Sequence, residues 1–286
     1  MLEDRDYMRA SEYGVNRWRT ATAIILIINA VVFLIEMIAP RLIPSDYLGL
    51  SWAGLRHGYV WQLLTFQFLH ANLLHIVLNS LGVFSFGFAV EQLLGRKRFL
   101  WLYLMSGLVG GLVHVLGGLI WPSHFGVLMD GAGNHFYIPM VGASAGLFGL
   151  IAAFALMFPE RDLTVYLFFV FPVTVSAKVL LGVSLGISIL GVVIDTSRVA
   201  HGAHAGGILG GWLMLRFFAW QSRRALYQRE REVEPPPQKK EFKSETDFVS
   251  KEVDPILEKI SQQGIQSLTA SERKILDEAR KKMEKR

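Results

Sequence analysis

The chain of 286 residues contains no cysteine, which excludes disulfides, thiolate metal sites and a cysteine nucleophile. Charge is also scarce: charged residues make up 19% of the chain, whereas a soluble domain usually carries about 25%. The charged residues gather near the two ends, so the middle is almost bare of them. The whole chain has 52% hydrophobic residues and a mean hydropathy of +0.36, and its middle has the composition of a membrane protein. The net charge of +5 is small, and no nucleic-acid partner is expected.

Long apolar runs predict six membrane helices, because crossing a bilayer takes about 20 mostly apolar residues. They cover residues 21–39, 70–94, 99–121, 142–158, 179–194 and 202–220. The first is too long for a signal-peptide core and is interpreted as a retained helix. Residues 163–177 are apolar and aromatic but contain Pro172, so the sequence leaves open whether they cross the membrane or lie at its interface.

Basic residues orient these helices. Arg17 and Arg19, the run 96–98, Arg161 with Lys178, and Arg223 with Arg224 all fall on one side if there are six spans. The excess of Lys and Arg marks the cytoplasmic side, which places both termini inside. The second, fourth and sixth helices then begin at the outer face. Polar residues in their first turns should therefore lie at a similar depth.

The expected fold is an all-α polytopic membrane protein with four parts. Residues 1–20 form a cytoplasmic N-terminal segment, and residues 21–224 form the six-helix membrane domain. Residues 225–250 are a charged linker that contains three consecutive prolines. Residues 251–286 show helical periodicity and a capping-box pattern at Thr269 and Glu272, which predicts a small cytoplasmic helical hairpin of undetermined role.

One serine stands out in the fourth apolar run. Ser144 lies between small residues, in Gly142-Ala143-Ser144-Ala145-Gly146. A serine is a poor nucleophile until a base accepts its proton, and His204 is the candidate base, in Ala203-His204-Ala205-Gly206-Gly207. Small residues let two membrane helices pack closely, which would bring the two side chains together. No acidic residue is placed to act as a third member, so a dyad is expected, with Phe148 against the imidazole.

A third stretch supplies candidate hydrogen-bond donors. His75 and Asn79 are four residues apart and share one helix face. Together with the amide of Ser144 they would form an oxyanion hole, in which each donor is worth about 2.7–4 kcal/mol of barrier. His70 lies near the outer end of the same helix and is expected to support them. His201 is a weaker second candidate for the base.

The whole set of motifs resembles the rhomboid family of intramembrane serine proteases. The matching residues are His70, His75 and Asn79; Gly87, Glu91 and Gly95; Gly142 to Gly146; and Ala203, His204, Gly207 and Gly211. The resemblance implies that Ser144 is the nucleophile, His204 the base, His75 and Asn79 oxyanion donors and Glu91 structural. It also implies membrane-protein substrates, no metal or cofactor, and a bacterial inner membrane. One departure is Trp61-Gln62, where many rhomboids have Trp-Arg.

Other classes of protein fit less well. A catalytically inactive rhomboid-like scaffold is the main alternative, but it would be expected to lose the serine or the histidine. A metal-dependent intramembrane protease needs an H-E-x-x-H helix, which the sequence lacks. An aspartyl protease needs two membrane aspartates, and Asp195 has no partner. A transporter would show inverted repeats, and none is found. The oligomeric state is left open.

Overall fold

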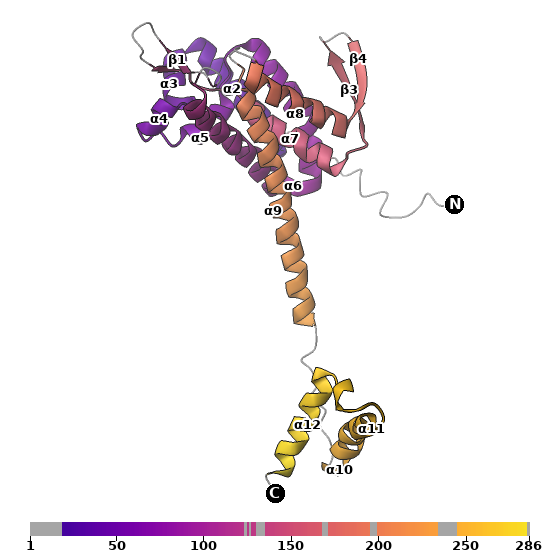
Figure 1. The fold of residues 1–286 in the computed structure, drawn as a ribbon. Coiled ribbons are helices and arrows are strands. Elements are labelled where there is room, and N and C mark those ends of the chain that lie inside the picture. Colours follow the sequence, from indigo (N-terminus) through magenta and orange to yellow (C-terminus); the bar gives the residue numbers. More distant parts are fainter. Residues whose placement is uncertain are drawn as a thin grey trace, which may run out of the picture. The chain divides into compact units, whose positions relative to one another are not determined.

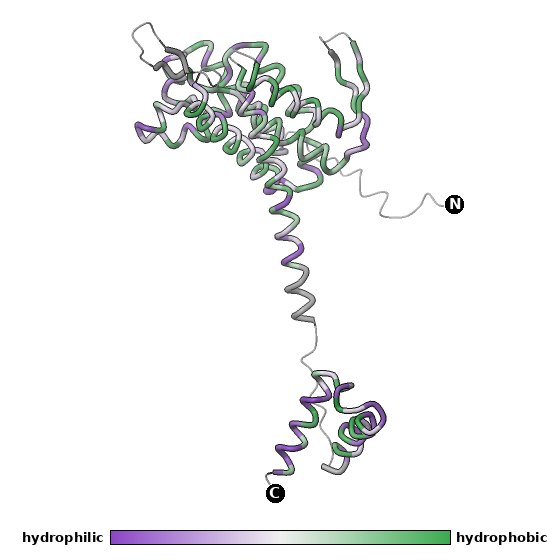
Figure 2. The backbone as a smooth tube through the Cα atoms, viewed as in Figure 1, coloured by the Kyte–Doolittle hydropathy of each residue, from purple (hydrophilic) through white to green (hydrophobic). Residues whose placement is uncertain are grey.

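The computed structural model describes residues 19–122, 125, 127–129, 135–167, 171–194, 199–233 and 245–284. It divides the chain into two compact units, Met1–Ala225 and Leu226–Arg286. The first unit is a bundle of helices, and the second is a small group of helices (Figure 1). The helices of the first unit are mostly hydrophobic, and those of the second are more hydrophilic (Figure 2). Membrane chemistry and the predicted site therefore belong to the first unit.

The first unit is built on α6 (Leu73–Ile120), which packs against both α2 (Ala21–Ile38) and α7 (Ser144–Met157). In turn, α7 packs against α8 (Ala177–Ile194). The last long helix, α9, begins at His201 and runs to Val233. Among the described residues, α2, α6 and α8 are long and apolar enough to cross a membrane, whereas α7 has 14 residues.

The long helix α6 contains two of the predicted helices. Its 48 residues would rise about 72 Å as one straight helix, more than twice the hydrocarbon thickness of a bilayer. Gly95 interrupts it with φ 75° and ψ 159°, a conformation that favours glycine. The two arms on either side of Gly95 correspond to the helices predicted at residues 70–94 and 99–121.

Large apolar side chains on the outside of this bundle are exposed. On α8 the exposed fraction is 52% for Val183, 58% for Ile187 and 58% for Leu190. On α2 it is 50% for Val31 and 55% for Leu34. Such exposed apolar surface is unusual on a soluble protein and suits contact with lipid, and Figure 2 shows hydrophobic colouring along these helices. We call this surface the lipid-facing belt.

The segment between α2 and α6 contains several short helices. They are η2 (Pro40–Leu42), α3 (Ser45–Leu48), α4 (Trp52–Arg56), α5 (Gln62–Thr65) and η3 (Phe66–Phe68). Gln62 is fully buried among them. Its side chain accepts a hydrogen bond from the amide of Ser51 and donates to the carbonyl of Asp46. A neutral amide thus ties this segment together at the position where the sequence departs from many rhomboids.

Two short antiparallel hairpins correct the prediction of a purely α-helical fold. One pairs β1 (Val127–Met129) with β2 (His135–Tyr137). The other pairs β3 (Asp162–Leu167) with β4 (Phe171–Ser176) and occupies the stretch whose crossing was left open. This stretch forms strands and not a helix because its apolar side chains recur at every second position and Pro172 cannot continue a helix.

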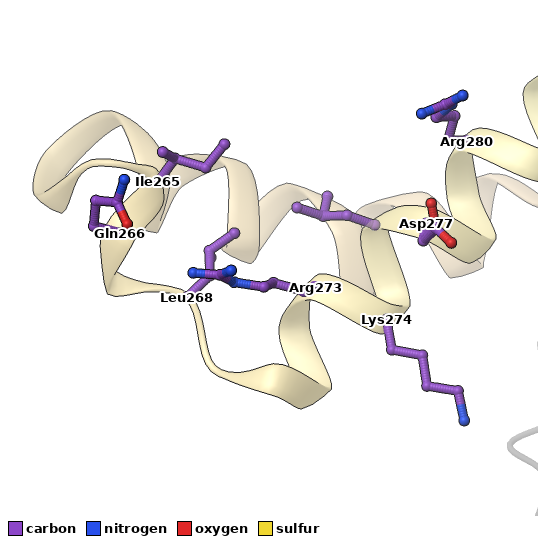
Figure 3. Close-up of a pocket in the computed structure, with 8 residues that line it drawn as sticks. Ile265, Gln266, Leu268, Arg273, Lys274, Asp277 and Arg280 are labelled. Atoms are coloured by element: carbon purple, nitrogen blue, oxygen red, sulfur yellow. The ribbon is translucent and has the colours of Figure 1, made fainter.

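The second unit contains more helix than the hairpin expected at residues 251–286. It comprises α10 (Glu245–Phe248), η5 (Val249–Val253), α11 (Asp254–Gln263), η6 (Ile265–Ser267) and α12 (Ala270–Met283). Thr269 and Glu272 form the predicted capping box, and Glu272 also pairs with Lys259 at 2.8 Å. A surface pocket of about 610 Å³ lies between η6 and α12 (Figure 3).

The predicted linker at residues 225–250 is also shorter in the structure. Helix α9 continues to Val233, and α10 already begins at Glu245. The residues that extend α9 are mostly Arg, Gln, Glu, Ala and Leu, which favour helix even without apolar burial. The three prolines lie outside the described residues.

Candidate active site

Ser144 is the first residue of α7. The backbone just before it has an unusual conformation at Gly142, which sets where the helix begins. Gly142 has φ +128°, a backbone conformation that other residues rarely adopt. Its amide donates a hydrogen bond to the carbonyl of Phe66, 2.9 Å away, which ties the start of α7 to η3. The serine hydroxyl therefore stands at a helix N-terminus, where the helix dipole favours negative charge.

The structure brings Ser144 and His204 together, although 60 positions separate them along the chain. The Nε2 atom of His204 lies 3.0 Å from the Oγ atom of Ser144, within hydrogen-bond distance. The ring of Phe148 is stacked on the imidazole, with 4.2 Å between centroids and 8° between planes. Phe148 is one turn below Ser144 on α7, so a single helix supplies both the hydroxyl and the surface that holds the ring.

Glycines make this approach possible. A Cβ atom added to Gly207 would overlap the backbone carbonyl of Ala145, and one added to Gly211 would lie 2.5 Å from the carbonyl oxygen of Gly149. The backbones of α7 and α9 are therefore in direct contact, as the small residues of both segments predicted.

The second arm of α6 also packs closely against α7 and α9. The sequence analysis did not predict this contact. A Cβ added to Gly110 would lie 2.5 Å from the carbonyl oxygen of Ala203 and 2.7 Å from the Cβ of Ala145. Gly149 is likewise in close contact with the side chain of Ser106. The signal was present, because Ser106 and Gly110 are small residues four positions apart on one helix face.

His75 and Asn79 lie beside the start of α7. A Cβ added to Gly142 would be 2.7 Å from the Nε2 atom of His75 and 3.8 Å from the Nδ2 atom of Asn79. The two side chains thus flank the residue two positions before Ser144. Asn79 is buried, and its Nδ2 atom has no hydrogen-bond partner among the residues that the structure describes.

His70 lies next to this pair. Its ring meets the ring of His75 edge-on at 5.3 Å between centroids. Its backbone amide donates to the carboxylate of Glu36 at 3.1 Å, so this glutamate at the end of α2 ties the two segments together. His70, His75 and Asn79 therefore lie near the N-terminal end of α7, where Ser144 is located.

Glu91 lies away from the dyad and holds the start of α2. Its carboxylate accepts hydrogen bonds from the amides of Ala21 and Thr22, at 2.7 and 2.8 Å. The hydroxyl of Thr22 donates a third bond, at 2.7 Å. Gly87, one turn earlier, leaves room for the Thr22 side chain. The carboxylate satisfies amides that a helix start leaves unpaired.

His201 stands next to His204 but does not replace it. The two rings meet edge-on at 6.1 Å between centroids, and it is His204 that lies within hydrogen-bond distance of Ser144. His201 packs instead against Gly191 of α8, where a Cβ would overlap its ring. His114, on the second arm of α6, is buried, and its ring centroid lies 5.5 Å from that of Phe125.

Comparison with known protein families gives two matches. A family model described as Rhomboid domain matches residues 57–221, which hold every residue of the site described above except Glu36 and the start of α2. A second model, described as a family of unknown function (DUF6576), matches residues 240–282. The second unit therefore resembles a family whose function is not known.

Individual proteins that resemble this chain are also named as rhomboid proteins. The chain is 30% identical to Rhomboid protein 1, mitochondrial, of Saccharomyces cerevisiae over 163 residues, which cover 56% of this chain and 43% of that protein. It is 31% identical to Putative rhomboid protease YdcA of Bacillus subtilis over 113 residues, covering 38% and 47%. It is also 31% identical to Inactive RHOMBOID-like protein 8 of Arabidopsis thaliana over 119 residues, covering 41% and 29%. The chain thus spans less than half the length of each of these relatives.

Proposed function

This chain belongs to the rhomboid family, a family of membrane-embedded proteins, and on that premise we propose that it is an intramembrane serine endopeptidase. Its substrates would be the membrane-spanning segments of other membrane proteins. The observation that carries the proposal is the distance of 3.0 Å between the Nε2 atom of His204 and the Oγ atom of Ser144. A serine hydroxyl within reach of an imidazole is the arrangement that makes it a nucleophile.

The proposed reaction is acyl transfer. Neutral His204 takes the proton of the Ser144 hydroxyl as the oxygen attacks the carbonyl carbon of the scissile peptide bond. The imidazolium then gives that proton to the leaving amine, and an ester of Ser144 remains. A water molecule, deprotonated by His204, hydrolyses the ester and regenerates the serine. The stacked ring of Phe148 replaces the carboxylate that orients the histidine in a triad.

The negative oxygen of the tetrahedral intermediate needs donors. His75, Asn79 and the backbone amide of Ser144 are proposed to supply them. In support, the Nδ2 atom of Asn79 is a buried donor without a partner among the described residues, which is costly unless a substrate oxygen uses it. The position of Ser144 at the start of α7 adds the favourable end of a helix dipole.

The proposed topology has six spans, with both termini in the cytoplasm and the dyad near the outer face. Helices α7 and α9 both present their first turns to the site, and α6 presents its first two turns. All three helices must therefore begin on the same side of the membrane. The basic residues at their opposite ends favour the cytoplasm for those ends, which puts the dyad near the outer face. We assign the chain to a bacterial inner membrane.

A fluorophosphonate probe tests the proposal without knowledge of the substrate. It should label the wild-type protein at Ser144, and Ser144→Ala should abolish the labelling while the protein still folds and inserts. His204→Ala should lose labelling too, whereas His201→Ala, one turn away on α9, should keep it. Labelling at another residue, or undiminished labelling of Ser144→Ala, would reject the assignment of the nucleophile.

The second candidate function is a catalytically inactive scaffold that binds membrane proteins. It is favoured by the similarity to a relative whose name marks it as inactive. Both members of the dyad are present here and within hydrogen-bond distance, which favours the protease. The two candidates separate in the probe experiment, because a scaffold would bind membrane-spanning segments without reacting with the fluorophosphonate.

A further inference from the structure

The hairpin of β3 and β4 has two chemically distinct faces. In its antiparallel register Leu163 is opposite Val175, and Val165 is opposite Val173. Side chains alternate between the faces of a strand, so these four apolar residues share one face. Thr164 and Thr174 are opposite each other on the other face, with their hydroxyl oxygens 3.4 Å apart.

Among the residues that the structure describes, the apolar face is covered at its base. Leu163 packs against the core of the helix bundle. Farther along the hairpin, the exposed fraction is 38% for Val173 and 64% for Phe171. The residues that connect the strands read Phe168-Phe169-Val170 in the sequence, without the Gly, Asn or Asp that hairpin turns in water favour. An apolar hairpin with an apolar connection is poorly suited to an aqueous surface.

The hairpin is also continuous with the lipid-facing belt. Its charged base holds an exposed ion pair between Glu160 and Lys178 at 2.7 Å. From there β4 passes directly into α8, whose exposed residues Val179, Val183 and Ile187 belong to that belt. Figure 1 shows the hairpin standing beside the start of α8, and Figure 2 shows hydrophobic colouring along its strands. Charged residues at one end of an apolar hairpin are typical of a segment that lies at the membrane surface.

We propose that this hairpin is a membrane-interface anchor whose partner is the lipid leaflet at the N-terminal end of α8. Its apolar face contacts the acyl chains, and its threonine face points to the headgroups and water. A two-stranded sheet has two open edges with unpaired N–H and C=O groups, which cannot be placed in the hydrocarbon core. The hairpin therefore lies flat at the interface and does not cross.

The anchor acts on α8, because no residue separates β4 from that helix. Only Ala177, Ser188 and Gly191 of α8 are buried in the protein, so few internal contacts fix its position. A hairpin held at the membrane surface would fix the depth and tilt of the N-terminal end of α8. This role is independent of the proposed chemistry.

The absence of cysteine permits a direct test in the full chain. Val173→Cys and Thr174→Cys are adjacent positions on opposite faces and form a matched pair, each carrying one nitroxide label. The protein is reconstituted in vesicles of phosphatidylcholine and phosphatidylglycerol, and label depth is measured from collisions with oxygen and with a water-soluble nickel complex. The label at position 173 should lie about 5–10 Å below the headgroup level, as in other interfacial segments. The label at position 174 should remain accessible to nickel.

Three results would overturn the proposal. Equal nickel accessibility at both positions would place the hairpin in water. Spin–spin broadening at position 173 that disappears on dilution with unlabelled protein would identify a second copy as the partner. A label at position 173 protected from both reagents would mean that protein covers the face. Adding Phe171→Asp should raise the 173 label toward water, whereas Thr164→Asp should not, and thermal unfolding in detergent confirms that each variant folds.

Discussion

The close contact of α7 and α9 predicts a large effect from one added methyl group. In Gly211→Ala the new Cβ would lie 2.5 Å from the carbonyl oxygen of Gly149, whereas ordinary contacts begin at 3.4 Å. The clash is with backbone, which cannot rotate away, so the two helices must separate by up to about 0.9 Å. Moved as rigid bodies, they would carry the Nε2 and Oγ atoms from 3.0 Å to about 3.9 Å, beyond hydrogen-bond reach.

Such a displacement should be costly, because a misplacement of 1 Å can lower a rate by about 100-fold. We therefore expect Gly211→Ala to lower the rate of fluorophosphonate labelling at Ser144 by about 10- to 100-fold. Gly211 is about two helical turns from His204, so the variant changes no group that takes part in the chemistry. The assay is a time course of labelling in detergent, with thermal stability measured on the same samples.

Gly182→Ala on α8 is the matched control. It makes the same substitution in an apolar helix, but nothing lies within 4 Å of the added Cβ. It should label at the wild-type rate and gain slightly in stability, because alanine favours helix over glycine by about 0.8–1 kcal/mol. Labelling of Gly211→Ala within threefold of wild type, or equal losses in both variants, would show that backbone contact does not set the geometry of the dyad.

Three further predictions concern other parts of the chain. Phe148→Ala should slow labelling by about 3- to 10-fold, because an aromatic stack is worth about 0.5–1.5 kcal/mol, and Phe158→Ala at the C-terminal end of α7 should not. Glu91→Gln should lower the free energy of unfolding by about 2 kcal/mol, since it weakens charge-assisted bonds to Ala21 and Thr22, while the folded fraction labels normally. In the second unit, hydrogen bonds from Lys259 and Thr269 lower the pKa of Glu272 to about 2. Its stabilisation should therefore be complete above the unfolded pKa near 4.5 and lost as pH falls toward 2, as seen by hydrogen exchange of α12, with the dependence reduced in Lys259→Met.

The structure brings together the residues that the sequence singled out for the site, whereas several other parts of the fold differ from the prediction. Ser144 and His204 each open a long apolar segment, and helix starts on the same side of a membrane lie at a similar depth. The number of preceding crossings therefore limits which residues can meet. The bounds of α2, α7 and α8 follow the predicted helices because lipid requires long apolar runs with internally bonded backbone. The family match covers residues 57–221, which include both segments.

The features that the sequence did not reveal depend on neighbours that are distant in the chain. That Gln62 is buried and holds the segment before α6 follows from three backbone partners that no local pattern identifies. The helical extension to Val233 was missed because it is polar, so apolar periodicity gave no signal there.

The hairpin of β3 and β4 was hidden for a different reason. Its residues are apolar enough to resemble a membrane helix, and only the alternation of Leu163, Thr164 and Val165 distinguishes a strand. In a membrane protein, hydrophobicity alone therefore cannot separate a segment that crosses the bilayer from one that lies on it. The decisive quantity is the period of the apolar residues, because a period of two leaves open backbone edges that only the interface can hydrate.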